Sequence, residues 1–242
     1  MIALFRKEIS TFFTSPIGYL VIALFLAAVG LFLWVFEGPF NIPYSGFASL
    51  RPFFELAPWI FTFLIPAIAM GSLSDEEKAG TLELLLTKPI TTWQIVLGKY
   101  LGILALIVIT LIPTLIHVWA VYNLGNPIGN LDIGAITGSY IGLLLLAGTF
   151  AAIGLFTSSL SSNQIVAFIA AVCICFMGYY GFEGIAEYNA LGKLDSYIAQ
   201  LSIKEHYNSI SRGVLDTRDL VYFISVILFF LFLTTQKLKK SK

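Results

Sequence analysis

The sequence predicts an all-α membrane protein with six transmembrane helices, an N-terminal interfacial amphipathic helix and a short cytoplasmic helix between spans two and three. Two observations lead to this fold class. Apolar residues make up 58% of the 242 residues and charged residues only 12%, about half the charged share of soluble domains. Several apolar stretches also reach the length of about 20 residues that a helix needs to cross a bilayer.

Composition also excludes several classes of protein. The 14 basic and 14 acidic residues give a net charge of zero, so the chain lacks the basic surface of a nucleic-acid-binding protein. Its high apolar content excludes intrinsic disorder. With two cysteines the chain is not a disulfide-stabilised secreted domain.

The apolar stretches divide the chain into spans and connecting segments. We expect one transmembrane domain over residues 1–242, with spans at about 18–36, 58–73, 98–121, 138–160, 164–182 and 220–235. The second and sixth stretches are short and need flanking residues to cross the bilayer. None shows the alternating pattern of an outer-membrane barrel strand.

The first 15 residues favour an amphipathic helix. Apolar residues recur at helical spacing while Arg6, Lys7 and Glu8 lie on other faces, a pattern typical of a helix in the membrane interface. The alternative is a simple flank of the first span. Because that span is longer than a signal-peptide core and no small-residue cleavage site follows it, we expect it to remain as an anchor.

Basic residues predict the orientation, because they are retained on the cytoplasmic side. With the N-terminus inside, nine basic residues are cytoplasmic and five are outside. The nine are Arg6, Lys7, Lys78, Lys88, Lys99, Lys237, Lys239, Lys240 and Lys242. We therefore expect a multi-pass protein of the bacterial inner (plasma) membrane with both termini in the cytoplasm.

Two outer segments connect the spans at greater length. Residues Glu37–Ala57 contain three prolines and are expected to be irregular or built of short pieces. Residues Glu183–Asp219 form the longest excursion. Leu194, Ile198 and Leu201 suggest a short helix resting on the membrane surface.

The cytoplasmic segment between spans two and three, residues 74–93, holds the main functional candidates. Ser74 with Glu77 predicts a capping box at a helix start, and Thr91 with Gln94 predicts another for the next helix. Between them, Glu76, Gly80, Glu83 and Thr87 recur at helical spacing as one polar or small stripe. Leucines flank this stripe, which favours a protein-docking element over a solvated loop whose leucines dip into lipid.

Other sites are weakly supported. Gly98-Lys99 and Gly192-Lys193 lack the rest of a P-loop, so the chain has no ATPase site of that type. The two histidines have no metal-ligand spacing, and His117 is expected to be a packed, hydrogen-bonded residue. The pairs Gly98/Gly102 and Gly138/Gly142 permit close helix approach within the bundle.

Three patches of sequence resemble the ABC type-2 exporter permeases. They are residues 5–8 (FRKE) with 12–19 (FFTSPIGY), residues 77–90 (EKAGTLELLLTKPI) with 93–100 (WQIVLGKY), and residues 206–222 (HYNSISRGVLDTRDLVY). Together they extend over essentially the whole chain. Within that family they are most similar to the gliding-motility-associated, GldF-like branch.

The resemblance implies a partner and a site. Such a permease works as a dimer, with a second copy or a paralogue, and with cytoplasmic ABC ATPase subunits that bind ATP and Mg, while the permease itself binds no cofactor. The gliding branch adds an accessory membrane protein. The coupling element that docks on the ATPase would comprise Glu76, Glu77, Gly80, Thr81, Glu83 and Thr87.

Other function classes remain as alternatives. An ion-coupled secondary transporter normally carries an intramembrane charged residue, and none lies in the middle of a span here. An intramembrane serine protease would need an exposed serine turn that the sequence lacks. A non-transporting membrane scaffold is the remaining alternative to the exporter permease.

Overall fold

The structure, a computed structural model, describes residues 2–87, 89–187, 200–213 and 216–240. Six helices are long and apolar enough to cross a membrane, and the described residues contain no strand. Each span overlaps one of the predicted stretches, which confirms the six-span, all-helical prediction. The spans are Pro16–Trp34, Arg51–Lys78, Thr92–Leu124, Ile133–Ser158, Gln164–Ile185 and Thr217–Lys240.

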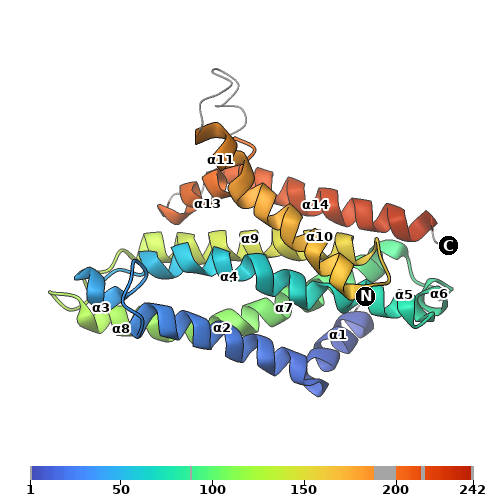
Figure 1. Ribbon diagram of the computed structural model, residues 1–242, viewed down its shortest axis with the longest axis horizontal. Coiled ribbons are helices and arrows are strands. Elements are labelled where there is room, and N and C mark those ends of the chain that lie inside the picture. Colours follow the sequence, from blue (N-terminus) through green and yellow to red (C-terminus); the bar gives the residue numbers. More distant parts are fainter. Residues whose placement is uncertain (1, 88, 188–199, 214–215, 241–242) are drawn as a thin grey trace.

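Several spans are built from more than one helical element (Figure 1). The elements are α1 (Ile2–Thr14), α2 (Pro16–Trp34), α3 (Ile42–Ser45), α4 (Arg51–Ala69), α5 (Gly71–Lys78), α6 (Thr81–Leu86), α7 (Thr92–Leu111), the 3-10 turn η1 (Ile112–Thr114), α8 (Leu115–Leu124), α9 (Ile133–Ser158), α10 (Gln164–Phe176), the π-helical turn η2 (Met177–Gly181), α11 (Phe182–Glu187), α13 (Ile203–Ser211) and α14 (Thr217–Lys240).

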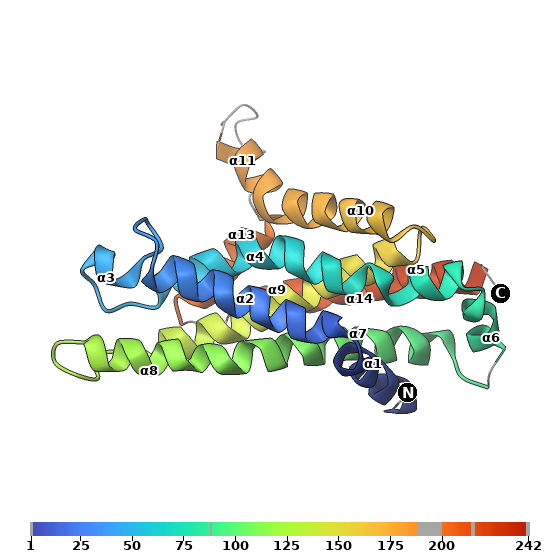
Figure 2. The same ribbon diagram turned by 60° about the horizontal axis from the view of Figure 1, so that its bottom comes forward.

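Helix α9 lies in the centre of the bundle. It packs against α4, α7, α10, α13 and α14 (Figures 1 and 2). Small residues allow this close packing: a Cβ added at Gly154 would lie 2.6 Å from the Cβ of Ala69 on α4. The apolar core is therefore organised around a helix that is buried on nearly all sides, with 78% of its apolar window inside the protein.

The outer helices have the opposite pattern. In the apolar 18-residue stretch of each helix, only 28% is buried in α2, 28% in α14 and 22% in the span that begins with α10. A soluble protein does not expose apolar surface on this scale. The bundle therefore has the exterior of a protein surrounded by lipid.

The second span includes flanking residues on both sides of the stretch 58–73, as expected. Its helix begins at Arg51, so the last seven residues of the segment Glu37–Ala57 are helical rather than irregular. Pro52 had suggested an irregular segment. In the first helical turn, however, proline is tolerated, because the N–H that it lacks would have no partner there anyway. The helix expected around Leu194 and Ile198 falls outside the described residues.

The glycine pairs are packing positions, as predicted. On α7, an added Cβ would lie 3.0 Å from Leu4 at Gly98 and 2.6 Å from Glu8 at Gly102, so these glycines seat α1. On α9, Gly138 and Gly142 lie against Ile210 of α13 in the same way.

The bundle has two distinct ends. The α6 end carries α1, α5, α6 and the last turns of α14, and the α3 end carries α3, the tip of α8 and the starts of α4 and α9 (Figure 2). Residues 2–14 form the helix α1, as predicted. The predicted coupling residues all lie at the α6 end.

Candidate coupling site

The segment between spans two and three forms two short helices. Helix α5 ends at Lys78 and α6 begins at Thr81, with Gly80 between them at a φ of 67°. A side chain is strained at this φ, which glycine adopts readily. The expected stripe of Glu76, Gly80, Glu83 and Thr87 along one helix is therefore wrong, because the chain changes direction at Gly80.

One of the two expected capping boxes is present. The Thr91 hydroxyl accepts a hydrogen bond from the Gln94 amide at 3.3 Å, and Gln94 Oε1 accepts one from the Thr91 amide at 3.1 Å. The Ser74–Glu77 box is wrong. Helix α5 begins at Gly71, directly after α4, so Ser74 lies inside a helix.

Five of the six predicted coupling residues lie on the surface of this element. They are Glu77, Gly80, Thr81, Glu83 and Thr87. Leu82 and Leu86, on the other side of α6, are buried. The two leucines therefore anchor α6 to the bundle, and its exposed face carries acidic and hydroxyl side chains together with Leu84.

The sixth predicted residue, Glu76, points inward and joins an ion-pair cluster in which Lys7 is exposed and the other three side chains are largely buried. Its Oε1 lies 3.0 Å from Lys7 Nζ on α1, and its Oε2 lies 3.1 Å from Lys99 Nζ on α7. Lys99 Nζ also lies 3.0 Å from Glu8 Oε1 on α1. We call Lys7, Glu8, Glu76 and Lys99 the four-charge cluster.

Lys99 is the centre of the four-charge cluster. Its side chain is 1% exposed, and its ammonium donates to Glu8 Oε1 at 3.0 Å and to the Ser72 carbonyl oxygen at 2.7 Å. The Lys99–Glu76 contact is ionic without hydrogen-bond geometry. Buried charges of this kind are stable when they are paired and hydrogen-bonded.

The electrostatics of the four-charge cluster are balanced, with two lysines and two glutamates. Burial alone lowers the pKa of Lys7, but its hydrogen bond to Glu76 and the charges of Glu76 and Glu8 outweigh burial and raise the pKa above its ordinary 10.5. Lys7 is therefore charged at neutral pH. Three elements, α1, α5 and α7, are held together by opposite charges.

Two further side chains fix α5 to the central bundle. The Ser158 hydroxyl, at the end of α9, donates to the Met70 carbonyl at 2.7 Å and accepts from the amides of Leu73 and Ser74 at 3.0 and 3.1 Å. Gln164, at the start of α10, donates to the Asp75 carboxylate. Helix α5 is thus attached to α1, α7, α9 and α10.

Sequence reasoning missed most of these connections. Lys99 was assigned to the cytoplasmic side as one more orienting charge, and Glu8 to a polar face of α1, whereas both are buried. A signal was present for Lys99: it is the one charged residue of the otherwise apolar helix α7, and a charge inside a membrane span predicts a partner of opposite sign. The Ser158 contact has no such local signal.

The third of the three sequence patches, residues 206–222, contains a contact that joins α13 to α14. His206 Nδ1 lies 2.6 Å from Asp219 Oδ1, and its Nε2 lies 2.9 Å from the Gln200 carbonyl oxygen. The imidazole stacks on Tyr222, whose hydroxyl donates to the Leu201 carbonyl. Its role is structural, and we call the His206–Asp219 contact between α13 and α14 the clasp.

His117 has the packed role that was predicted. It is 9% exposed, and its Nδ1 accepts a hydrogen bond from Trp34 Nε1 at 3.1 Å. It therefore joins α8 to α2 within the bundle.

Comparison with known proteins fits this arrangement. The sequence pattern of the ABC-2 family of transporter proteins matches residues 2–235, nearly the whole chain. The chain belongs to the ABC-2 family. It is thus related to the permeases of ABC transporters, as the three sequence patches indicated.

Two bacterial relatives show a more distant likeness. The "Probable multidrug ABC transporter permease YbhR" of Escherichia coli K12 and that of Escherichia coli O157:H7 are each 32% identical to this ABC-2 protein over 115 residues. The match covers 48% of this chain and 30% of each relative. The match therefore reaches less than a third of the length of either relative.

Proposed function

We propose that this ABC-2 protein is the permease subunit of an ATP-driven exporter, and that a separate cytoplasmic ABC ATPase docks on the outward face of α5 and α6. The observation that supports this most strongly is the attachment of α5. A docking element must pass force to the spans, and α5 is bonded to α1, α7, α9 and α10.

The exposed residues of the element fit a docking surface. Glu83 and Glu77 are exposed carboxylates, and charge-assisted hydrogen bonds from an ATPase would be stronger than neutral ones. Nothing lies within 4 Å of a Cβ built on Gly80. The backbone of a partner could therefore approach Gly80 without displacing any side chain of this protein.

Further parts of the proposal rest on the sequence resemblance. We assign the α6 end and both termini to the cytoplasm of a bacterium and place the protein in its inner membrane. We further propose a dimer with a second copy or a paralogue, an accessory membrane protein, and work of the gliding-motility type. ATP and Mg would be bound by the partner ATPase. The multidrug description belongs to the Escherichia coli relatives.

Docking is tested with Glu83→Lys and a matched Glu37→Lys control, an exposed acidic residue at the α3 end. The full chain is purified from its host, and co-purification of an ABC ATPase and ATP hydrolysis in lipid are measured. We expect Glu83→Lys to weaken assembly by about 2–5 kcal/mol if the contact is buried in the complex. Glu37→Lys should behave as wild type.

Gly80 needs a variant that keeps the backbone conformation. Gly80→Leu both fills the surface and strains a residue at φ 67°, whereas Gly80→Asn tolerates that φ and adds a smaller side chain. Reduced assembly in Gly80→Asn at normal thermal stability would support docking at this point. Wild-type assembly and coupled ATP hydrolysis in both Glu83→Lys and Gly80→Leu would place the docking surface elsewhere.

A further inference from the structure

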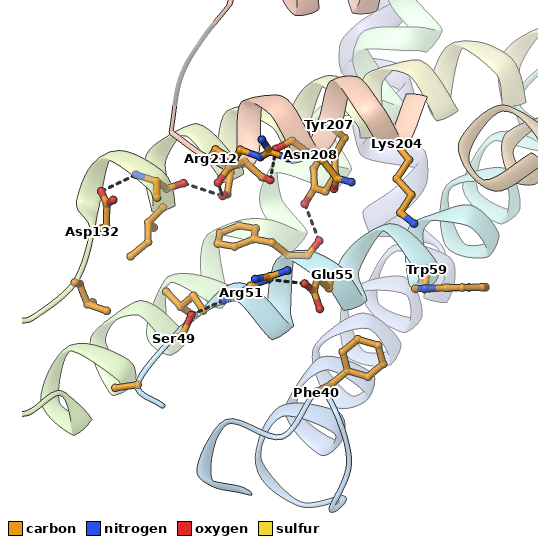
Figure 3. Close-up of a pocket in the computed structure, with 18 of the residues that line it drawn as sticks. Phe40, Ser49, Arg51, Glu55, Trp59, Asp132, Lys204, Tyr207, Asn208 and Arg212 are labelled. Atoms are coloured by element: carbon orange, nitrogen blue, oxygen red, sulfur yellow. Dashed lines mark hydrogen bonds and ion pairs between the residues drawn. The ribbon is translucent and has the colours of Figure 1, made fainter. Parts of the chain in front are cut away.

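A cavity of about 930 Å³ opens at the α3 end, far from the coupling element. Its walls come from α4, α9 and α13, and from the segment that precedes α4. Figure 3 shows Arg51, Glu55 and Trp59 on the α4 wall and Lys204, Asn208 and Arg212 on the α13 wall. No part of the coupling function uses this cavity.

Of the three basic side chains that line the cavity, two form ion pairs: Arg51 with Glu55, and Lys204 with Glu183 at 2.5 Å. Of its two carboxylates, Glu55 lies 2.7 Å from Arg51 Nε, and Asp132 accepts a hydrogen bond from the Ala135 amide to cap α9. Among the described residues, no carboxylate forms an ion pair with Arg212. Its guanidinium thus has donors available for a ligand, in a fork geometry that suits phosphate or carboxylate oxygens.

Tyr180, another lining residue, offers a second donor. Its hydroxyl is buried and has no hydrogen-bond partner within the described part of the chain. Its ring stacks on Trp59 with centroids 4.2 Å apart, and η2 places it there. A buried hydroxyl without a partner is costly, and π-helical turns often occur at functional sites. Because the oxygen itself has almost no accessible surface, a ligand oxygen would satisfy it after a small rotation of the ring toward the cavity.

The position of the cavity favours an amphiphile over a free ion. Arg51 and Ile133 are the first residues of α4 and α9, so the cavity lies at the depth where spans begin and lipid headgroups lie. Its volume is within the range of pockets for whole organic ligands, about 300–1,000 Å³. Trp59 is 43% exposed and continues the apolar wall toward the membrane.

We propose that this cavity binds the acidic headgroup of an anionic amphiphile from the adjacent leaflet. Arg212 bonds the phosphoryl or carboxylate oxygens, the Tyr180 hydroxyl donates to a headgroup oxygen, and the alkyl chain leaves past Trp59. The His206–Asp219 clasp keeps α13, and with it Arg212, at this wall.

Binding to the delipidated full chain is measured by native mass spectrometry, with phosphatidylglycerol, phosphatidylethanolamine and inorganic phosphate as separate probes. We expect preferential retention of phosphatidylglycerol, no displacement by millimolar phosphate, and about tenfold weaker binding in Arg212→Gln, as for one lost charged hydrogen bond. Arg218→Gln, which removes an exposed arginine on α14 outside the cavity, is the matched control and should bind as wild type.

Tyr180→Phe separates ligand binding from a structural role. Because the hydroxyl has no partner in the described chain, its removal should leave the thermal stability of the lipid-free protein unchanged or raised, while phosphatidylglycerol binding weakens. Lower stability with intact binding would overturn the proposal. So would equal binding of the two lipids, equal behaviour of Arg212→Gln and Arg218→Gln, or displacement of the lipid by millimolar phosphate, which indicates a small-anion site.

Discussion

Replacing Lys99 by methionine tests whether the four-charge cluster holds α1, α5 and α7 together. Lys99 is 1% exposed, and its loss leaves the nearly buried Glu8 carboxylate without its ion pair, while Glu76 keeps Lys7 at 3.0 Å. Removing one partner of a buried pair costs about 3–5 kcal/mol, since the remaining charge is stranded. For a chain of this size, each kcal/mol lowers Tm by about 2–4 °C, so we expect a loss of about 6–20 °C.

The assay is thermal unfolding of the full chain in detergent, with Lys239→Met as the matched control. Lys239 is an exposed lysine on α14 at the same α6 end, so its replacement changes net charge equally without touching the cluster. We expect Lys239→Met to unfold as wild type. ATP hydrolysis by the reconstituted complex reports in parallel on coupling.

A double variant makes the prediction sharper. Lys99→Met combined with Glu8→Met removes one charge of each sign and leaves the Lys7–Glu76 pair. Buried ion pairs are often replaced by well-packed apolar residues at little cost, so most of the lost stability should return. A Tm for Lys99→Met equal to that of Lys239→Met, or a double variant no more stable than Lys99→Met, would refute the reasoning.

Two other predictions concern packing and orientation. Gly102→Leu should lower Tm by several degrees because a Cβ at this position lies 2.6 Å from Glu8, whereas Gly30→Leu, with open space around it, should not; equal Tm values would contradict the packing of α1 on α7. In a cysteine-free background, Glu77→Cys should be labelled from the cytoplasm and Tyr44→Cys, exposed at the α3 end, from outside. Labelling of both from one side would contradict the six-span topology.

The spans could be predicted from the sequence because membrane crossing depends on length and mean hydropathy, which are local properties. The same holds for the Thr91–Gln94 box, whose two residues lie within one turn. The start of the second span was harder. Pro52 suggested an irregular segment, yet proline is compatible with a first helical turn, and membrane helices tolerate interior prolines such as Pro58.

A short helical segment between spans two and three was predicted from the sequence, but its shape was not. Extending one helical period across Gly80 placed Glu76 and Glu83 on the same face, while the structure directs Glu76 inward and Glu83 outward. The signal for a break was Gly80 itself, because glycine after the last helical turn commonly ends a helix.

The four-charge cluster shows why other contacts could not be predicted. Glu8 and Lys99 are separated by 91 residues, and they meet because α1 is seated on Gly98 and Gly102 at one register. The glycine pair was visible in the sequence, but which helix it would receive was not. A register between two distant helices depends on the packed shape of both, which no local pattern contains.

The span Arg51–Lys78 connects the two sites that we propose. It begins with the cavity residues Arg51 and Trp59 and ends with Glu76 in the four-charge cluster, and its 28 residues correspond to about 40 Å of helix. The joint between α4 and α5 is fixed by Ser158, which donates to the Met70 carbonyl between the two helices and accepts from the amides of Leu73 and Ser74 in α5.

Because this joint is bonded on both sides, a displacement of α5 by a docked ATPase would be transmitted into α4 rather than absorbed between them. Interior prolines leave two points where α4 can bend, Pro58 and Pro66. Pro58 lies next to Trp59 at the cavity, and its carbonyl accepts the Thr62 hydroxyl at 2.8 Å. Motion of the α6 end would therefore change the α4 wall of the cavity first at Trp59. This is the point where we expect the alkyl chain of the bound amphiphile to leave the cavity.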